Sequence, residues 1–162
     1  MSQSNDDGEI QRVDRLLDST LENVDLAEAD VTRLAEEIGF DEEDLHRIGI
    51  AVRESMVNAV VHGNHYSTKK KVHFSVVHSV VTGNGNAPQD CLRVVIEDEG
   101  EGFQKQEVPD PLAEENLLRH SGRGLLLIEA FMDRFVIEPR TPQQGTRVTL
   151  VKYKARQATP GA

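Results

Sequence analysis

The residues best suited to chemistry lie along one stretch, Ile48–Asn64, with the sequence IGIAVRESMVNAVVHGN. Glu54, Asn58 and His62 follow one another at intervals of four, which places a carboxylate, an amide and an imidazole in one stripe along a helix. A carboxylate can take a proton from an attacking hydroxyl group, and an amide oxygen is a hard ligand that suits Mg²⁺. The same spacing is also typical of a solvated helix face, so the stripe by itself leaves both interpretations open.

Two glycine motifs further along the chain fit the same chemistry. In DEGEGF, Asp98 ends an expected strand, and Gly100 and Gly102 allow a ligand to approach the backbone closely. An aspartate there can accept a hydrogen bond from the amino group of a ring such as adenine. In SGRGL, residues 121–125, the glycines open an expected helix whose free N–H groups, with the arginine, favour a phosphate. Each motif alone is equally compatible with a plain loop or a hinge.

Hydrophobic periodicity predicts the elements that position these motifs. A helix is expected at Val24–Ile38, ended by Gly39, and a second one from the capping residue Asp41 to about Val61. Strands are expected at 10–19, where a short helix is the alternative, and at 70–81, 91–97, 133–138 and 146–153, with a further helix at 122–132. The stretch 104–121 has no regular period and is interpreted as a lid. This order predicts an α+β two-layer sandwich, with helices on one face of a mixed, mostly antiparallel sheet.

Net charge and cysteine content limit the classes of binding partner and the cellular compartment expected for this chain. The chain has 162 residues and a formal net charge of −10, which argues against direct binding of nucleic acid or of an anionic membrane surface. Cys91 is the single cysteine, so an internal disulfide is impossible, which suits the cytoplasm. Residues 1–9 are expected to be a disordered N-terminus, 10–154 one domain and 155–162 a tail.

In this order the motifs resemble the GHKL ATP-binding fold, which chaperone, type II topoisomerase, mismatch-repair and histidine-kinase ATPases share. Within that fold, the chain is most similar to the bacterial anti-sigma factor serine/threonine protein kinases. The resemblance rests on ESMVNAVVHGN, DEGEGF, the run from VPDP through ENLL to HSGRGLLLIEAFMD, and the Gly-Thr pair before the last strand. It extends over roughly residues 16–154, almost the whole chain.

The resemblance implies a role for each matching residue. Glu54 would be the general base, Asn58 would coordinate the Mg²⁺ bound to ATP, and Asp98 would hydrogen-bond the adenine amino group. The residues implied to shape the adenine pocket or to wrap the phosphates are Gly100, Gly102, Ser121, Gly122, Arg123, Gly124, Leu125 and Thr146. His62 also matches the family pattern, but no catalytic role is expected for it. The loop 82–90 is long for this family.

The implied function is that of an ATP-dependent protein serine/threonine kinase that acts as an anti-sigma factor in transcription regulation. Such a protein binds a sigma factor, holds it inactive, and phosphorylates a serine of an anti-anti-sigma antagonist of the STAS class. The resemblance also implies a homodimer. The alternative is a nucleotide-gated switch that binds partners without phosphotransfer. A histidine-kinase fragment is disfavoured because residues 1–40 are short and contain no histidine. A zinc site is disfavoured because the histidines of the chain lack a convincing fourth ligand.

Overall fold

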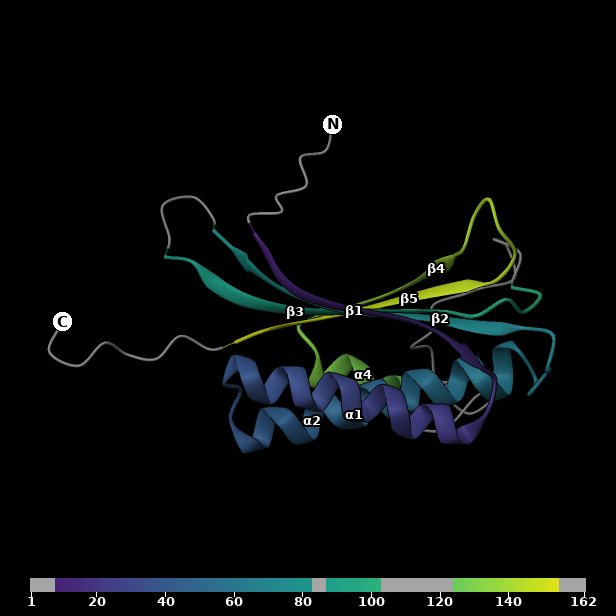
Figure 1. Cartoon of the computed structure of the whole chain (residues 1–162), viewed down its shortest axis with the longest axis horizontal. Coiled ribbons are helices and arrows are strands. Elements are labelled where there is room, and N and C mark those ends of the chain that lie inside the picture. Colours follow the sequence, from purple (N-terminus) through teal and green to yellow (C-terminus); the bar gives the residue numbers. More distant parts are fainter. Residues whose placement is uncertain (1–7, 83–86, 103–123, 155–162) are drawn as a thin grey trace, which may run out of the picture.

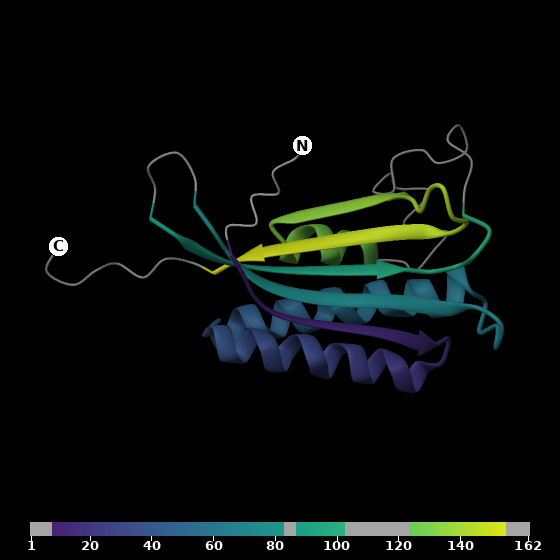
Figure 2. The ribbon, with the colours of Figure 1, turned by 45° about the horizontal axis from the view of Figure 1, so that its top comes forward.

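A computed structural model describes residues 8–82, 87–102 and 124–154 as two layers. One layer is a five-stranded sheet, and the described helices all lie on one of its faces (Figure 1). Figure 2 shows β1 (Glu9–Asp18) at one edge of the sheet beside α1 (Leu21–Ile38), and β4 (Arg134–Pro139) at the other edge near α4 (Gly124–Phe131). The α+β two-layer sandwich predicted from the sequence is confirmed.

Every neighbouring pair in the sheet is antiparallel, in the order β1-β2-β3-β5-β4. The strands are β1 (Glu9–Asp18), β2 (Lys71–Val81), β3 (Gln89–Glu97), β4 (Arg134–Pro139) and β5 (Thr146–Tyr153). The prediction of a mixed sheet is therefore wrong for the described strands. β3 and β4 run in the same direction because each is antiparallel to β5, but β5 lies between them, so they form no parallel pair.

The predicted strands agree with the observed ones to within about two residues, and the main difference is at the β2–β3 hairpin. Gln89 and Asp90 pair with Val81 and Val80, so they belong to β3 and not to the connecting loop. The loop is therefore 82–88 and not 82–90, and residues 83–86 of it lie outside the described chain.

The first helix, α1 (Leu21–Ile38), begins three residues before the predicted start. Thr20 caps it by accepting a hydrogen bond from the backbone N–H of Asn23. At its other end, Gly39 has φ +105° and donates its N–H to the last turn, as the sequence predicts. The buried side chains follow the helical period, and they are Val24, Ala27, Asp30, Val31, Leu34, Ala35 and Ile38.

The second helix, α2 (Glu42–Val57), begins at the predicted cap, where Asp41 accepts a hydrogen bond from the N–H of Asp44 at 2.8 Å. It continues as a π-helix, η1 (Asn58–Gly63), so the helical stretch ends two residues after the predicted end at about Val61 and changes its period. The N–H of Asn64 bonds to the carbonyl of Ala59, five residues earlier. Short π-helical turns are rare and occur often at functional sites.

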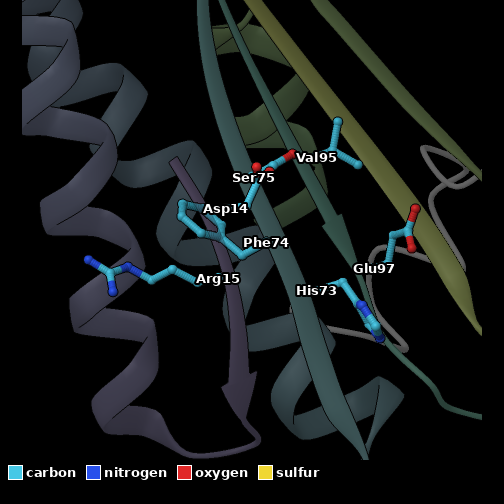
Figure 3. Close-up of a pocket in the computed structure, with 7 residues that line it drawn as sticks. All are labelled: Asp14, Arg15, His73, Phe74, Ser75, Val95 and Glu97. Atoms are coloured by element: carbon cyan, nitrogen blue, oxygen red, sulfur yellow. The ribbon is translucent and has the colours of Figure 1, made fainter. Parts of the chain in front are cut away.

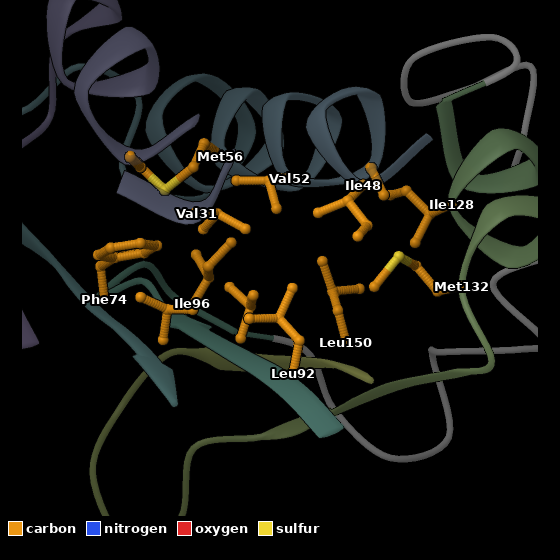
Figure 4. Close-up of a cluster of buried hydrophobic side chains, with 14 of the residues drawn as sticks. Val31, Ile48, Val52, Met56, Phe74, Leu92, Ile96, Ile128, Met132 and Leu150 are labelled. Carbon is orange, nitrogen blue, oxygen red and sulfur yellow. The ribbon is translucent and has the colours of Figure 1, made fainter. Parts of the chain in front are cut away.

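The core lies between the two layers (Figure 4). From the helices, Ile48, Val52 and Met56 point toward Leu92 and Leu150 of the sheet. The helix α4 (Gly124–Phe131) packs against α2 and adds Ile128. This packing fixes the apolar side of α2 against the sheet and holds its polar stripe at the margin of the core. None of the described helices is long and apolar enough to cross a bilayer.

Candidate functional site

Asp98 forms the floor of the first part of the site. It follows β3 two residues after the inward-facing Ile96, so it points into the space between the sheet and the helices, and it is only 7% exposed. Its Oδ1 accepts hydrogen bonds from the N–H of Gly100 at 2.9 Å and of Thr146 at 3.3 Å. Within the described residues its Oδ2 makes no hydrogen bond, so in that part of the chain one oxygen is held by the backbone and the other has no hydrogen-bond partner. Burial raises the pKa of Asp98, against the smaller opposing effect of the two hydrogen bonds.

Glycines allow the turn after Asp98 to pack backbone against backbone. A Cβ at Gly100 would overlap the carbonyl of Gly63, and one at Gly63 would overlap the Asp98 carboxylate. A Cβ at Gly145 would overlap the Asp98 carbonyl group. Gly102 has φ +73°, which side chains rarely tolerate. The turn therefore lies directly against the end of η1 and against the β4–β5 hairpin.

Asn64 ties this turn to its surroundings. It is 1% exposed, and its Oδ1 accepts a hydrogen bond from the N–H of Glu99 at 2.8 Å. Its Nδ2 donates to Ser19 Oγ at 2.9 Å and to the carbonyl of Lys71 at 3.0 Å. The Ser19 hydroxyl in turn donates to the carbonyl of Lys70 at 2.6 Å. A buried amide with both donors and its oxygen engaged stabilises one arrangement of these segments.

An ion-pair network extends behind the turn. Glu97 accepts from Arg140 Nε at 2.8 Å and from Arg147 Nε at 2.6 Å. Burial acts to raise the pKa of Glu97, but the hydrogen bonds from the two arginines outweigh it, and the pKa lies below its ordinary value. The network therefore favours the ionised form of Glu97 and joins β3 to the β4–β5 hairpin.

Glu99 joins the same network to β2. Its Oε1 accepts from the backbone N–H of Lys71 at 2.9 Å, and its Oε2 lies 2.7 Å from Nε2 of His73. The hydrogen bond from Lys71 is the main cause that lowers the pKa of Glu99, and His73 is the next. The turn is thus held through both the backbone and the side chain of Glu99.

The second part of the site is at the start of η1. The backbone N–H of Asn58 bonds to the carbonyls of Glu54 and Ser55 as the cap of α2. Its side-chain Oδ1 is buried, and no partner for it exists among the described residues. A buried oxygen without a partner costs about 1–3 kcal/mol, so it calls for a ligand. Glu54, one turn earlier, is half-buried and makes no side-chain hydrogen bond within the described ranges.

The orphan oxygen of Asn58 fits a magnesium ion. Mg²⁺ prefers hard oxygen ligands and often takes one or two from the protein and the rest from phosphates and water. The described residues contain no group of three or more His, Cys, Asp or Glu side chains that could hold a metal ion. An ion at Asn58 would therefore need most of its ligands from a phosphate compound and solvent, which is the usual situation of Mg²⁺ bound to a nucleotide.

The third predicted motif, SGRGL at residues 121–125, falls only partly within the described residues. Gly124 and Leu125 are buried in the first turn of α4, which packs against α2. Ser121, Gly122 and Arg123, and the predicted lid at 104–121, lie outside the described residues. His62 is exposed on η1, apart from the core-facing side.

The structure therefore brings the first two motifs together at the two ends of one short helix. Asn58 is the first residue of η1, and Asp98 lies against Gly63, its last residue. Sequence reasoning missed the contacts of Asn64 and of Gly145. Both residues stand in the sequence motifs, Asn64 as the last residue of ESMVNAVVHGN and Gly145 in the Gly-Thr pair. Neither motif indicates which residues they contact.

A separate hollow of about 220 Å³ lies on the sheet face that the described helices leave uncovered (Figure 3). The residues that line it are Asp14, Arg15, His73, Phe74, Ser75, Val95 and Glu97. None of the residues predicted from the motifs lines it, because Asp98 and Asn58 belong to the helix side of the sheet. The hollow shares Glu97 and His73 with the hydrogen-bond network beside the Asp98 turn, but it contains none of the predicted site residues.

Comparison with known proteins agrees with this geometry. The family described as histidine kinase-like ATPase domain matches residues 17–152. The serine-protein kinase RsbW of Oceanobacillus iheyensis is 30% identical over 142 residues, which cover 84% of this chain and 82% of the relative. RsbW of Bacillus velezensis is 29% identical over 138 residues, covering 82% and 79%. RsbW of Staphylococcus epidermidis is 26% identical over 147 residues, covering 87% and 86%.

The family resemblance seen in the motifs is thereby confirmed. The matched region contains both parts of the site, from Glu54 and Asn58 to Asp98 and Thr146. Its extent also includes all five strands of the sheet, at least in part. The chain therefore belongs to the histidine kinase-like ATPase domain family and, within it, to the group of the bacterial anti-sigma factor serine/threonine protein kinases.

Proposed function

We propose that this chain binds ATP with Mg²⁺ and transfers the terminal phosphoryl group to a serine of a protein substrate. The single observation that best supports this is the orphan oxygen of Asn58 at one end of η1, with the available Oδ2 of Asp98 at the other. One ligand that carries a hydrogen-bond donor on a ring and a metal-bound phosphate chain matches both ends. ATP is such a ligand.

In this proposal Asp98 Oδ2 accepts the hydrogen bond of the adenine amino group, and Gly100, Gly102 and Thr146 shape the pocket around it. Asn58 Oδ1 holds the magnesium ion, which supplies charge neutralisation at the phosphates when it is bound. Residues Ser121, Gly122, Arg123, Gly124 and Leu125 keep their predicted role of wrapping the phosphates.

Glu54 takes the proton in the proposed reaction. The serine Oγ of the substrate forms a bond to the terminal phosphorus, the bond from that phosphorus to the bridging oxygen breaks, and ADP leaves. The hydroxyl proton passes to the Glu54 carboxylate. A half-buried carboxylate that makes no ion pair within the described part of the chain is available for this step.

We further propose that the substrate is an anti-anti-sigma protein of the STAS class and that the chain also binds a sigma factor and holds it inactive. The support is the motif resemblance together with the serine-protein kinase relatives. The proposal includes a homodimer and a cytoplasmic location, where a sigma factor works. The net charge of −10 favours protein partners with basic surfaces over nucleic acid.

The test is single-turnover transfer from labelled ATP to a serine-containing STAS protein. Glu54→Gln should lower the transfer rate about 10²–10⁴-fold, because a positioned base contributes that much, while ATP affinity stays within about twofold. Undiminished transfer by Glu54→Gln rules out the base. ATP binding by the wild-type chain without any phosphoprotein product would favour the nucleotide-gated switch instead.

A further inference from the structure

Asn64 stands at the junction of the two parts of the site. It follows η1 directly, and its side chain reaches three other segments: the β1–α1 junction through Ser19, the start of β2 through Lys71, and the Asp98 turn through Glu99. All of its side-chain hydrogen-bonding groups are engaged, and it is 1% exposed. No role in binding or catalysis follows from this residue's own chemistry, because no part of it is open to a ligand.

The contact between η1 and the Asp98 turn requires a hydrogen bond that holds the two segments together. Where the two segments touch, Gly63 and Gly100 meet backbone to backbone, and neither has a side chain to hold the other. The hydrogen bond from the Glu99 N–H to Asn64 Oδ1, at 2.8 Å, crosses this contact. It fixes the peptide that joins Asp98 to Glu99, and with it the base of the Asp98 side chain.

We propose that Asn64 is a positioning residue for the nucleotide site: it sets the placement of η1, which begins with Asn58, relative to the Asp98 turn. The inference rests on the proposed function. A ligand that must contact Asp98 and Asn58 together depends on this placement, since a misplaced contact is lost or strained. A ligand that contacts only the Asp98 turn depends on it far less.

This difference separates positioning from a general effect on folding. We compare Asn64→Ala with Ile38→Val, which removes one methyl group from the core at the C-terminal end of α1. The next residue, Gly39, lies near Lys154, beyond the end of β5 that is farthest from Thr146, so the control is remote from the site. Binding of Mg²⁺ with a non-hydrolysable ATP analogue, and of adenosine, is measured by titration at a temperature where all variants are folded.

For Asn64→Ala we expect the affinity for the Mg²⁺–analogue complex to fall at least tenfold and that for adenosine less than threefold. Amide exchange at Glu99 should become faster, since its hydrogen-bond acceptor is gone. Ile38→Val should change both affinities by less than twofold. Equal losses for the two ligands, or a loss of the Mg²⁺–analogue complex no larger than in the control, would overturn the positioning role.

Two further outcomes are distinguishable. If the wild-type chain binds neither ligand, the proposed function fails, and the positioning role that rests on it fails with it. If the wild type binds both ligands and Asn64→Ala does so equally well, only the positioning role fails.

Should Asn64→Ala not fold, Ser19→Ala carries the test, because it removes one anchor of the Asn64 side chain and leaves the bond to Glu99. The same preferential loss, of about threefold, is then expected, and its absence contradicts the inference.

Discussion

Two asparagines at the two ends of η1 have opposite environments. Asn64 is buried and its side chain is fully hydrogen-bonded, whereas Asn58 has a buried oxygen with no partner among the described residues. The same residue type, six positions apart, is therefore a structural tie at one end and an open ligand position at the other. The fold therefore holds the Asp98 end of the site in place by hydrogen bonds. At the other end, the oxygen of Asn58 lacks a partner among the described residues, and a ligand can supply one.

The largest expected effect, on stability and on adenosine binding together, comes from substituting Gly100 in the Asp98 turn. In Gly100→Ala the new Cβ would overlap the carbonyl of Gly63, and because backbone cannot move as easily as a side chain, we expect a loss of about 1–3 kcal/mol in the free energy of unfolding. Adenosine binding should be lost with it. Denaturant unfolding and titration measure the two effects.

The matched control is another buried glycine, Gly49 in α2. A Cβ there meets the carboxylate end of Glu28, which is flexible, and a methyl of Thr32 at 3.4 Å. Since alanine is the better helix former by about 1 kcal/mol, Gly49→Ala should leave stability unchanged or raise it. Equal destabilisation by the two substitutions would show that the Asp98 turn is no more tightly built than an ordinary helix position.

Stability measurements on alanine variants test the contrast between the two asparagines directly. Asn64→Ala removes three hydrogen bonds and leaves the Glu99 N–H and the Lys71 carbonyl unpaired, so it should cost about 1–3 kcal/mol. Asn58→Ala removes an oxygen that has no partner in the described chain, so it should cost less than about 0.5 kcal/mol or stabilise the fold.

In ligand binding, Asn58→Ala should still lower the affinity for Mg²⁺ with ATP about tenfold or more, while binding of adenosine is retained. Thermal or denaturant unfolding, combined with titration of both ligands, tests this pair of variants. A large loss of stability in Asn58→Ala would mean that its oxygen is satisfied within the protein, and the contrast between the two ends of η1 would disappear.

The smallest expected effect is on the pH dependence of stability. The pKa of Glu99 is lowered in the folded state, chiefly by the N–H of Lys71, so its contribution is present above its ordinary pKa of 4.5 and is lost as the pH falls through the lowered value. Glu99→Gln should therefore flatten the loss of stability in acid. The pKa of Asp98 is raised, so this group acts in the opposite direction, and its ionisation opposes folding above its folded pKa.

Unfolding midpoints at pH 7 and at about pH 3.5 measure this change. The control is Glu101→Gln, which alters an exposed carboxylate two residues further along the turn. If Glu99→Gln and the control have the same acid sensitivity as the wild type, the hydrogen bonds of Glu99 do not contribute to stability.

Local patterns predicted the elements well, because their causes are local. Asp41 begins α2 and Gly39 ends α1 through hydrogen bonds to neighbouring residues, so spacing alone reveals them. Alternating apolar residues likewise located the strands, including Thr146–Tyr153 without error. The change of helical period at Asn58 was not predicted, since no residue type specifies a π-helical turn and its cause lies in how the segment packs.

The sequence by itself determined the elements, the two-layer class and the family, because capping, periodicity and ordered motifs need no knowledge of distant contacts. Only the tertiary structure decided that β5 lies between β3 and β4, and that Asn64 is bonded while Asn58 is not. Both outcomes depend on which segments, distant in the chain, meet in space. A hydrogen bond exists only where both partners are brought together, and an asparagine in a motif does not indicate what will stand opposite its amide.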